Sequence, residues 1–174
     1  MAMTWTAPDV ERHRAPVVAD ERTMLDGWLD FHRQTLLTKC AGLTAEQLRT
    51  ASVEPSGLTL LGLVRHCADN ERYWFRQQFA RLDVPSLYAI PEQPDRDLED
   101  VADADPVADF AIFREEVELG RQAVAGRELD DTFVSPRGKD VSLRWVYLHM
   151  IEEYARHNGH ADLIRERLDG TTGE

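Results

Sequence analysis

Apolar residues recur at helical spacing in four separate stretches of this chain, and no stretch of comparable length alternates as a half-buried strand does. An amphipathic helix buries its apolar stripe against a neighbour, so the pattern predicts an all-α protein built as a four-helix bundle. The chain has 174 residues, which suits one domain, expected over residues 19–170 after a partly ordered N-terminal tail at residues 1–18. The four predicted helices cover residues 20–41, 59–81, 106–126 and 142–168.

Start signals for helices support these boundaries. Thr44 is followed three residues later by Gln47, a capping-box pattern that predicts a short helical turn after the first long helix. Asp105 precedes a proline at the first helical position, and Ser142 is a good N-cap for the last helix. Between the third and fourth helices, residues 133–141 are expected to form a turn or a small hairpin.

The connection over residues 82–105 is long, proline-containing and acidic. Neighbouring antiparallel helices in a bundle are usually joined by short loops, so this connection is expected to cross the bundle end or wrap its side. The acids between Glu92 and Asp105 are interpreted as a solvated surface.

The charge balance excludes several classes of partner. The chain carries 32 acidic and 20 basic side chains, a formal charge of −12, which would repel nucleic acid and anionic membranes. No apolar run approaches the roughly 20 residues of a membrane span, and the N-terminal residues lack a secretory-signal pattern, so a cytoplasmic protein is expected. Cys40 and Cys67 are expected to be free thiols in apolar surroundings.

The last predicted helix carries the strongest functional signal. At about 100° per residue, Glu153 and His157 fall within its apolar stripe. A buried carboxylate costs several kcal/mol unless it is paired, and a bound cation is one partner that would justify the position. Spacing of four residues puts the two side chains about one turn apart on one face, as helix bundles present metal ligands.

A third ligand must come from another helix, and His66 on the second helix is the best candidate. Two imidazoles and one carboxylate suit a divalent metal, with zinc preferred and nickel or iron as alternatives. Three protein ligands leave coordination positions open, which is typical of a catalytic rather than a structural metal site.

Simpler interpretations of these residues stay open. His66 alone would more often be a hydrogen-bonded core histidine than a ligand. Glu153 could instead form a salt bridge with Arg65, Arg144 or Arg156.

Further polar residues are candidates for the surroundings of the site. His32 lies on the inward stripe of the first helix and is interpreted as core or as a group supporting the ligands rather than a fourth ligand. His149 and His160 flank the stripe of the last helix and are expected to line a pocket or to hydrogen-bond a ligand. The candidates for orienting a substrate are Asn70, Tyr73, Arg156 and His160.

Several motifs together resemble the DinB-like superfamily, and within it the domain-of-unknown-function 664 group. The resemblance covers residues 20–168, and it implies an up-down-down-up bundle whose long second connection joins parallel helices. The motifs that carry it are a tryptophan-bearing first helix, GLTAEQL at 42–48, LLGLVRH at 60–66, ERYWF at 71–75 and the segment 149–160 with Arg165-Glu166.

The resemblance also implies a ligand set. His66 matches the histidine of the second helix, and His157 matches the last histidine of a His-x-x-x-His pair. Glu153 stands where that pair usually has its first histidine, but the related mycothiol-dependent maleylpyruvate isomerases are similar to this chain in using His, Glu and His. Characterised relatives include transferases that use mycothiol, bacillithiol or glutathione.

Together these observations predict a divalent-metal-binding, thiol-dependent transferase or isomerase, with mycothiol as thiol cosubstrate and a small electrophile as second substrate. The alternatives are a metal-dependent hydrolase and a non-catalytic metal-binding or dimerisation bundle. A homodimer is compatible with each of these.

Overall fold

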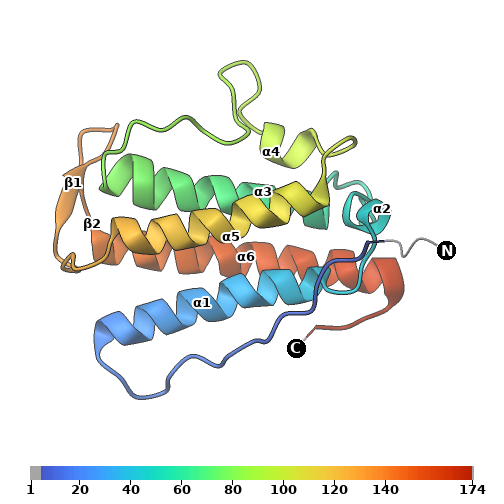
Figure 1. The fold of residues 1–174 in the computed structure, drawn as a ribbon, viewed down its shortest axis with the longest axis horizontal. Helices are drawn as coiled ribbons and strands as arrows, with labels where there is room; N and C mark the ends of the chain where they lie inside the picture. The colour runs from blue at the N-terminus through green and yellow to red at the C-terminus, as the bar shows by residue number, and fades with distance from the viewer. Residues whose placement is uncertain (1–4, 174) are drawn as a thin grey trace.

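The computed structural model describes residues 5–173, and four long helical segments packed side by side form its body (Figure 1). The long segments are α1 (Glu21–Cys40), α3 (Leu60–Glu71) continued by the π-helix η1 (Arg72–Phe79), α5 (Pro106–Ala123) and α6 (Leu143–Asp169). The short elements are α2 (Ala45–Leu48), α4 (Arg96–Glu99), β1 (Thr132–Val134) and β2 (Asp140–Ser142).

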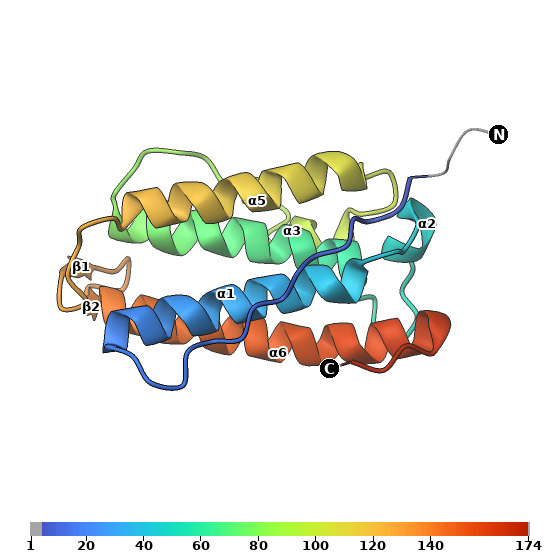
Figure 2. The same cartoon turned by 60° about the horizontal axis from the view of Figure 1, so that its bottom comes forward.

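The helices follow the up-down-down-up order that the family resemblance implies. α3 and α5 run in one direction, while α1 and α6 run in the other (Figures 1 and 2). The connection between η1 and α5 returns along the length of the bundle, as parallel neighbours require, and it carries α4 on the way (Figure 1). Of the two courses predicted for residues 82–105, across the bundle end or along its side, the structure shows the second.

The predicted helix starts are confirmed in detail. Thr44 and Gln47 form both hydrogen bonds of a capping box at α2. Asp105 accepts a hydrogen bond from the second helical N–H of α5, and Ser142 accepts one from the third helical N–H of α6. Strands β1 and β2 pair antiparallel, so the predicted turn or hairpin before α6 is a hairpin.

The N-terminal segment runs back beside α1 (Figure 2). Ala7 is buried, and its backbone exchanges hydrogen bonds with Gly42 and Leu43 at the end of α1. The ring of Trp5 lies edge-on to Phe110, with 6.1 Å between the ring centroids. This early segment therefore adds apolar contacts to one end of the bundle.

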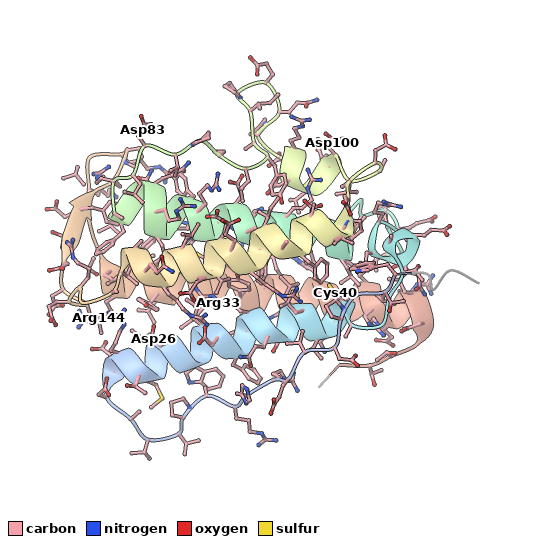
Figure 3. All side chains as sticks on the ribbon, in the orientation of Figure 1. Asp26, Arg33, Cys40, Asp83, Asp100 and Arg144 are labelled. Atoms are coloured by element: carbon pink, nitrogen blue, oxygen red, sulfur yellow. The ribbon has the colours of Figure 1, made fainter. Side chains whose placement is uncertain are left out.

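The interior contains a buried ion pair between α1 and α3 in addition to its apolar core. Arg33 donates from Nε and Nη2 to the two carboxylate oxygens of Glu71, at 2.7 Å each, and the Tyr154 hydroxyl donates to Glu71 at 2.8 Å. This arrangement satisfies the buried charges and ties α1, α3 and α6 together. Figure 3 shows Arg33 and Cys40 on α1 and places Asp83 and Asp100 on the outer connection.

Both cysteines are free and buried, as the sequence predicts. Burial raises the pKa of Cys40 to about 12 and raises that of Cys67 as well, so both thiols stay protonated at neutral pH.

The predicted helix over residues 59–81 is present, but its second part is π-helical rather than α-helical. The change begins at Arg72, directly after the buried Glu71. The wider turn alters the direction of the side chains that follow, and π-helical segments are frequent near functional sites.

Among the described residues, no helix is long and apolar enough to cross a membrane.

Candidate metal centre

The structure brings the three predicted ligands together between α3 and α6. Glu153 Oε2 lies 3.5 Å from His157 Nε2 and 3.9 Å from His66 Nε2. One donor atom from each residue lies within 4.8 Å of the other two. The imidazole rings of His66 and His157 are also close, with 4.7 Å between their centroids.

A hydrogen bond from the connection before α5 orients His66. Its Nδ1 lies 2.7 Å from Asp97 Oδ2, a bond in which the ring N–H donates to the carboxylate. The Nε2 atom then carries the free electron pair and accepts a hydrogen bond from the Asn70 amide at 3.0 Å. Burial lowers the pKa of His66, but the hydrogen bond and charge of Asp97 outweigh it, and the net pKa shift is upward.

Asp97 contacts a candidate ligand, and the sequence interpretation does not find it. The acids between Glu92 and Asp105 were expected to form a solvated surface, yet Asp97 is only 5% exposed. The expectation is wrong at this position because α4 folds back against α3. A four-residue helix has too little length to show periodicity, so no sequence signal separates Asp97 from its exposed neighbours.

Gly62 allows this close approach of α4. A Cβ at Gly62 would lie 3.1 Å from the Leu98 carbonyl oxygen and 3.3 Å from the Leu98 Cα. Since both neighbours are backbone atoms, a larger residue would push α4 outward. Gly62 therefore helps to keep Asp97 within hydrogen-bond distance of His66, one turn further along α3.

Of the three arginines considered as partners of Glu153, only Arg156 lies near it. Arg156 Nη1 is 3.5 Å from Glu153 Oε1, whereas its Nη2 is 2.5 Å from Glu152. Arg65 and Arg144 pair with other acids. The Arg156 side chain is 55% exposed, so this long contact is a weak reason for the inward position of Glu153.

The three candidate ligands differ in burial. His157 is buried, while the side chains of Glu153 and His66 are 15% and 23% exposed. The sequence placed Glu153 within the buried stripe, and the structure places it at the edge of that stripe, where the site opens. The pKa of His157 is lowered to about 4, chiefly by burial, so its imidazole is neutral and able to bind a cation at pH 7.

Two further histidines of α6 lie next to this set. His160 Nδ1 is 3.4 Å from His157 Nδ1, on the side of the ring away from Glu153. His149 has a ring nitrogen within 4.8 Å of carboxylate oxygens of Glu152 and Glu153, and its ring also lines a pocket. The sequence predicted such flanking positions for both histidines.

Of the other residues predicted to surround the ligands, Asn70 and Tyr73 lie near the metal centre or the pocket, whereas His32 does not contact the ligands. Tyr73 lines the same pocket as His149, and Asn70 contacts His66 directly. His32 lies on α1, half-buried, with Nδ1 3.4 Å from the amide of Asn158. No contact joins His32 to the three candidate ligands within the part of the chain that the structure describes.

The residues present fit a divalent cation by their chemistry and spacing. Two ligand atoms that each lie about 2.0–2.1 Å from a tetrahedral zinc ion are about 3.3 Å apart. The distances from Glu153 Oε2 to Nε2 of His157 and of His66, 3.5 and 3.9 Å, are close to this value. The Asp97–His66 pair reproduces the carboxylate–histidine arrangement that supports metal ligands in proteins. Two imidazoles and one carboxylate leave space for further ligands.

A cavity of about 740 Å³ lies beside the centre, at the hairpin end of the bundle. It is bounded by η1, by the N-terminal turns of α6 and by the β1–β2 hairpin. His149 belongs to its wall and lies close to Glu153, so the cavity reaches the edge of the candidate metal centre.

Comparisons with known proteins identify a family and a similar fold. A family model described as mycothiol-S-transferase matches residues 24–170. Among solved structures, a conserved protein of locus from Enterococcus faecalis is similar in fold, with a TM-score of 0.62 and 16% sequence identity. The match covers 88% of this chain and 100% of that chain, and at this identity it shows the fold alone. No curated protein matches the chain.

Proposed function

Since the chain belongs to the mycothiol-S-transferase family, a DinB-like family, we propose that it is a metal-dependent enzyme that transfers mycothiol to a small electrophile. The observation that carries the proposal is the convergence of His66, Glu153 and His157, next to a cavity whose wall residue His149 lies close to Glu153. A set of three ligands open on one side is the arrangement of catalytic metal sites.

In the proposed site His66, Glu153 and His157 would hold a divalent ion, with zinc preferred and nickel or iron as alternatives. Zinc bound there would lower the pKa of a neighbouring thiol, so that the nucleophilic thiolate forms at neutral pH. Glu153 supplies the single negative charge of the set. In the transfer the thiol sulfur bonds to the electrophilic carbon, the leaving group departs with its bonding pair, and the thiol proton passes to solvent.

The remaining residues near the centre have supporting roles in this proposal. Asp97 holds His66 in the tautomer that presents Nε2 to the site. Asn70 and His160 contact the ring nitrogens of His66 and His157, and both could orient the ligands or the substrate. Tyr73 and His149 line the cavity, and Arg156 lies at the exposed edge next to Glu153.

The first test measures metal content. Protein purified without chelator is expected to carry close to one zinc, nickel or iron ion per chain by elemental analysis. His66→Ala and His157→Ala are expected to lose tight binding, whereas His13→Ala, in the exposed N-terminal segment, serves as the control. Removal of the ion should lower the melting temperature, because a ligand that binds only the folded state stabilises it. A metal-free protein that does not take up zinc would remove the proposed site.

The second test measures transfer. The metal-loaded protein is mixed with mycothiol and 1-chloro-2,4-dinitrobenzene, and formation of the thioether is followed by absorbance. Thioether formation that disappears in His157→Ala would support the proposal. Hydrolysis of an ester or amide substrate without thiol transfer would favour the metal-dependent hydrolase instead, and metal binding without either reaction would favour a non-catalytic bundle.

A further inference from the structure

The cavity beside the metal centre combines an aromatic wall with a basic loop. Its aromatic wall comes from η1 and from the first turns of α6, and its basic loop is the turn of the β1–β2 hairpin. Its volume of about 740 Å³ is within the range of small-molecule sites.

Three rings of the wall are mutually in contact. Trp145 and His149 are stacked, with 4.8 Å between centroids and an interplanar angle of 11°. Trp74 meets both of them at steep angles, with centroid separations of 5.2 Å from Trp145 and 4.8 Å from His149. Trp145 is nevertheless 44% exposed, so it presents ring surface on which a further flat ring could stack.

The hairpin turn holds two cations at the cavity. Ser135 and Lys139 are joined by a backbone hydrogen bond of 2.8 Å, and Gly138 adopts a φ of 72°, which closes a tight turn around Arg137. Arg137 and Lys139 both line the cavity and both are exposed. Within the described residues neither forms an ion pair, in contrast to Arg144 nearby, which pairs with Glu21.

The two cations create a locally basic region in a chain with a formal charge of −12. The overall field repels anions, and the cavity lining contains only one acidic residue, Asp140, against Arg137 and Lys139. Cations that form no ion pair with the described residues, at the edge of an aromatic cavity, are complementary to an anionic group on a flat ligand.

We propose that this cavity binds the electrophilic substrate, and that this substrate is a planar aromatic compound bearing an anionic group such as a carboxylate or sulfonate. Its ring stacks on Trp145, and its anionic group lies near Arg137 and Lys139. His149 belongs to the cavity wall and lies close to Glu153, so the ring edge opposite the anionic group, with the reactive carbon, lies on the side of the metal centre. The role as substrate rests on the proposed transferase function, whereas binding of the aromatic anion does not.

Binding is tested without any reaction. Equilibrium dialysis compares 3,5-dinitrobenzoate with neutral 1,3-dinitrobenzene, using the protein as purified and again after treatment with a chelator. Parent protein is expected to bind the anion more tightly. Arg137→Ala/Lys139→Ala should weaken anion binding by about fivefold, the effect of two exposed charge contacts, with neutral-ligand binding unchanged. Added salt should reduce the preference for the anion.

Two further variants test whether ligand binding depends on this cavity rather than on the overall charge of the protein or on misfolding. Arg114→Ala/Arg167→Ala removes two exposed cations far from the cavity and is expected to leave the anion preference intact. Trp145→Leu should weaken both ligands, while its melting temperature stays close to that of the parent because the ring is half exposed. Equal affinity for the two ligands, or an equal loss in the control double variant, would overturn the proposal.

The substrate role is tested with a reactive pair. 4-Chloro-3,5-dinitrobenzoate and neutral 1-chloro-2,4-dinitrobenzene both react with a thiol by forming a carbon–sulfur bond and releasing chloride with the bonding pair, while the thiol proton passes to the buffer. The ratio of their kcat/KM values is expected to fall about fivefold in Arg137→Ala/Lys139→Ala, as for binding. An unchanged ratio would overturn the substrate role. Retained binding with no turnover of either compound would contradict the transferase function and leave the binding site in place.

Discussion

Asp97 accepts a hydrogen bond from Nδ1 of His66 at 2.7 Å, across the contact between α4 and α3. The bond joins a residue of the long acidic connection to a candidate ligand of the metal centre. It determines which ring nitrogen of His66 faces Glu153, so the connection takes part in the site rather than only joining two helices.

Replacing Asp97 by Asn tests this relationship. The amide keeps the size of the side chain but removes the negative charge that supports the imidazole. Zinc affinity, measured by competition with a chromophoric chelator, is expected to fall by about 10 to 100-fold. Asp100→Asn, on the same connection but paired with Arg96 at the surface, should leave the affinity unchanged. Parent-like affinity in Asp97→Asn would show that the bond does not support a ligand.

The sequence identifies the parts of this site that lie on long helices. His66, Glu153 and His157 could be found because the α-helical period places them on defined faces, and the caps at Thr44 and Ser142 follow from local hydrogen bonding. The helical period and the helix caps depend only on residues that are close in the sequence.

Other features depend on tertiary contacts that no local pattern reports. The position of Asp97 requires the return of α4 onto α3 at Gly62. The buried pairing of Arg33 with Glu71 joins residues 38 positions apart, and the π-helical turn begins directly after Glu71. Packing between elements decides these features, so they appear only in the folded chain.

Gly62→Ala is expected to act on both stability and metal binding. The added Cβ would lie 3.1 Å from the backbone of Leu98, so α4 must shift, at a cost of about 1–3 kcal/mol for overpacking. The shift would also lengthen the Asp97–His66 hydrogen bond and lower zinc affinity. Urea unfolding and zinc competition measure the two effects.

Gly159→Ala is the matched control for that variant. Gly159 lies within α6, and a Cβ there would have no heavy atom within 4 Å. Alanine should therefore stabilise the helix by about 0.5–1 kcal/mol. If both variants gain stability, the close approach at Gly62 imposes no steric limit.

Glu116 on α5 gives a pH-dependent prediction. Burial alone would raise its pKa, but Arg72 and Arg76 donate hydrogen bonds of 2.6–2.8 Å and the net shift is downward. A carboxyl whose pKa is lowered by folding stabilises the protein above its unfolded pKa, near 4.5, and loses this contribution as the pH falls through its folded pKa.

Glu116→Gln is therefore expected to lower the free energy of unfolding by about 2 kcal/mol at neutral pH, because two partly buried arginines lose their counter-charge. The difference from the parent should shrink progressively below pH 4.5. Urea unfolding at several pH values measures it, with the exposed Glu118→Gln on the same helix as control. A difference that does not change with pH would argue against a lowered pKa.

Two substitutions of Glu153 distinguish a role as metal ligand from a role as ion-pair partner. If it binds metal, Glu153→Gln removes the negative charge and the stronger donor, so zinc affinity should fall steeply. Glu153→His should retain metal, because imidazole is a good zinc ligand and the variant restores the three-histidine set of the wider family, although loss of the anionic ligand should alter activity.

If Glu153 only pairs with Arg156, 3.5 Å away, the order of the two variants reverses. Gln would then keep both metal and stability, since that contact is long and exposed, whereas His would disturb packing without improving metal binding. Arg156→Ala provides the control. If Glu153 is a ligand, zinc affinity should survive the loss of Arg156. If Glu153 is only an ion-pair partner, Arg156→Ala and Glu153→Gln should have equal, small effects on stability. Zinc affinity and melting temperature measured together on the three variants decide between these roles, because parent-like affinity in Glu153→Gln is incompatible with a ligand at this position.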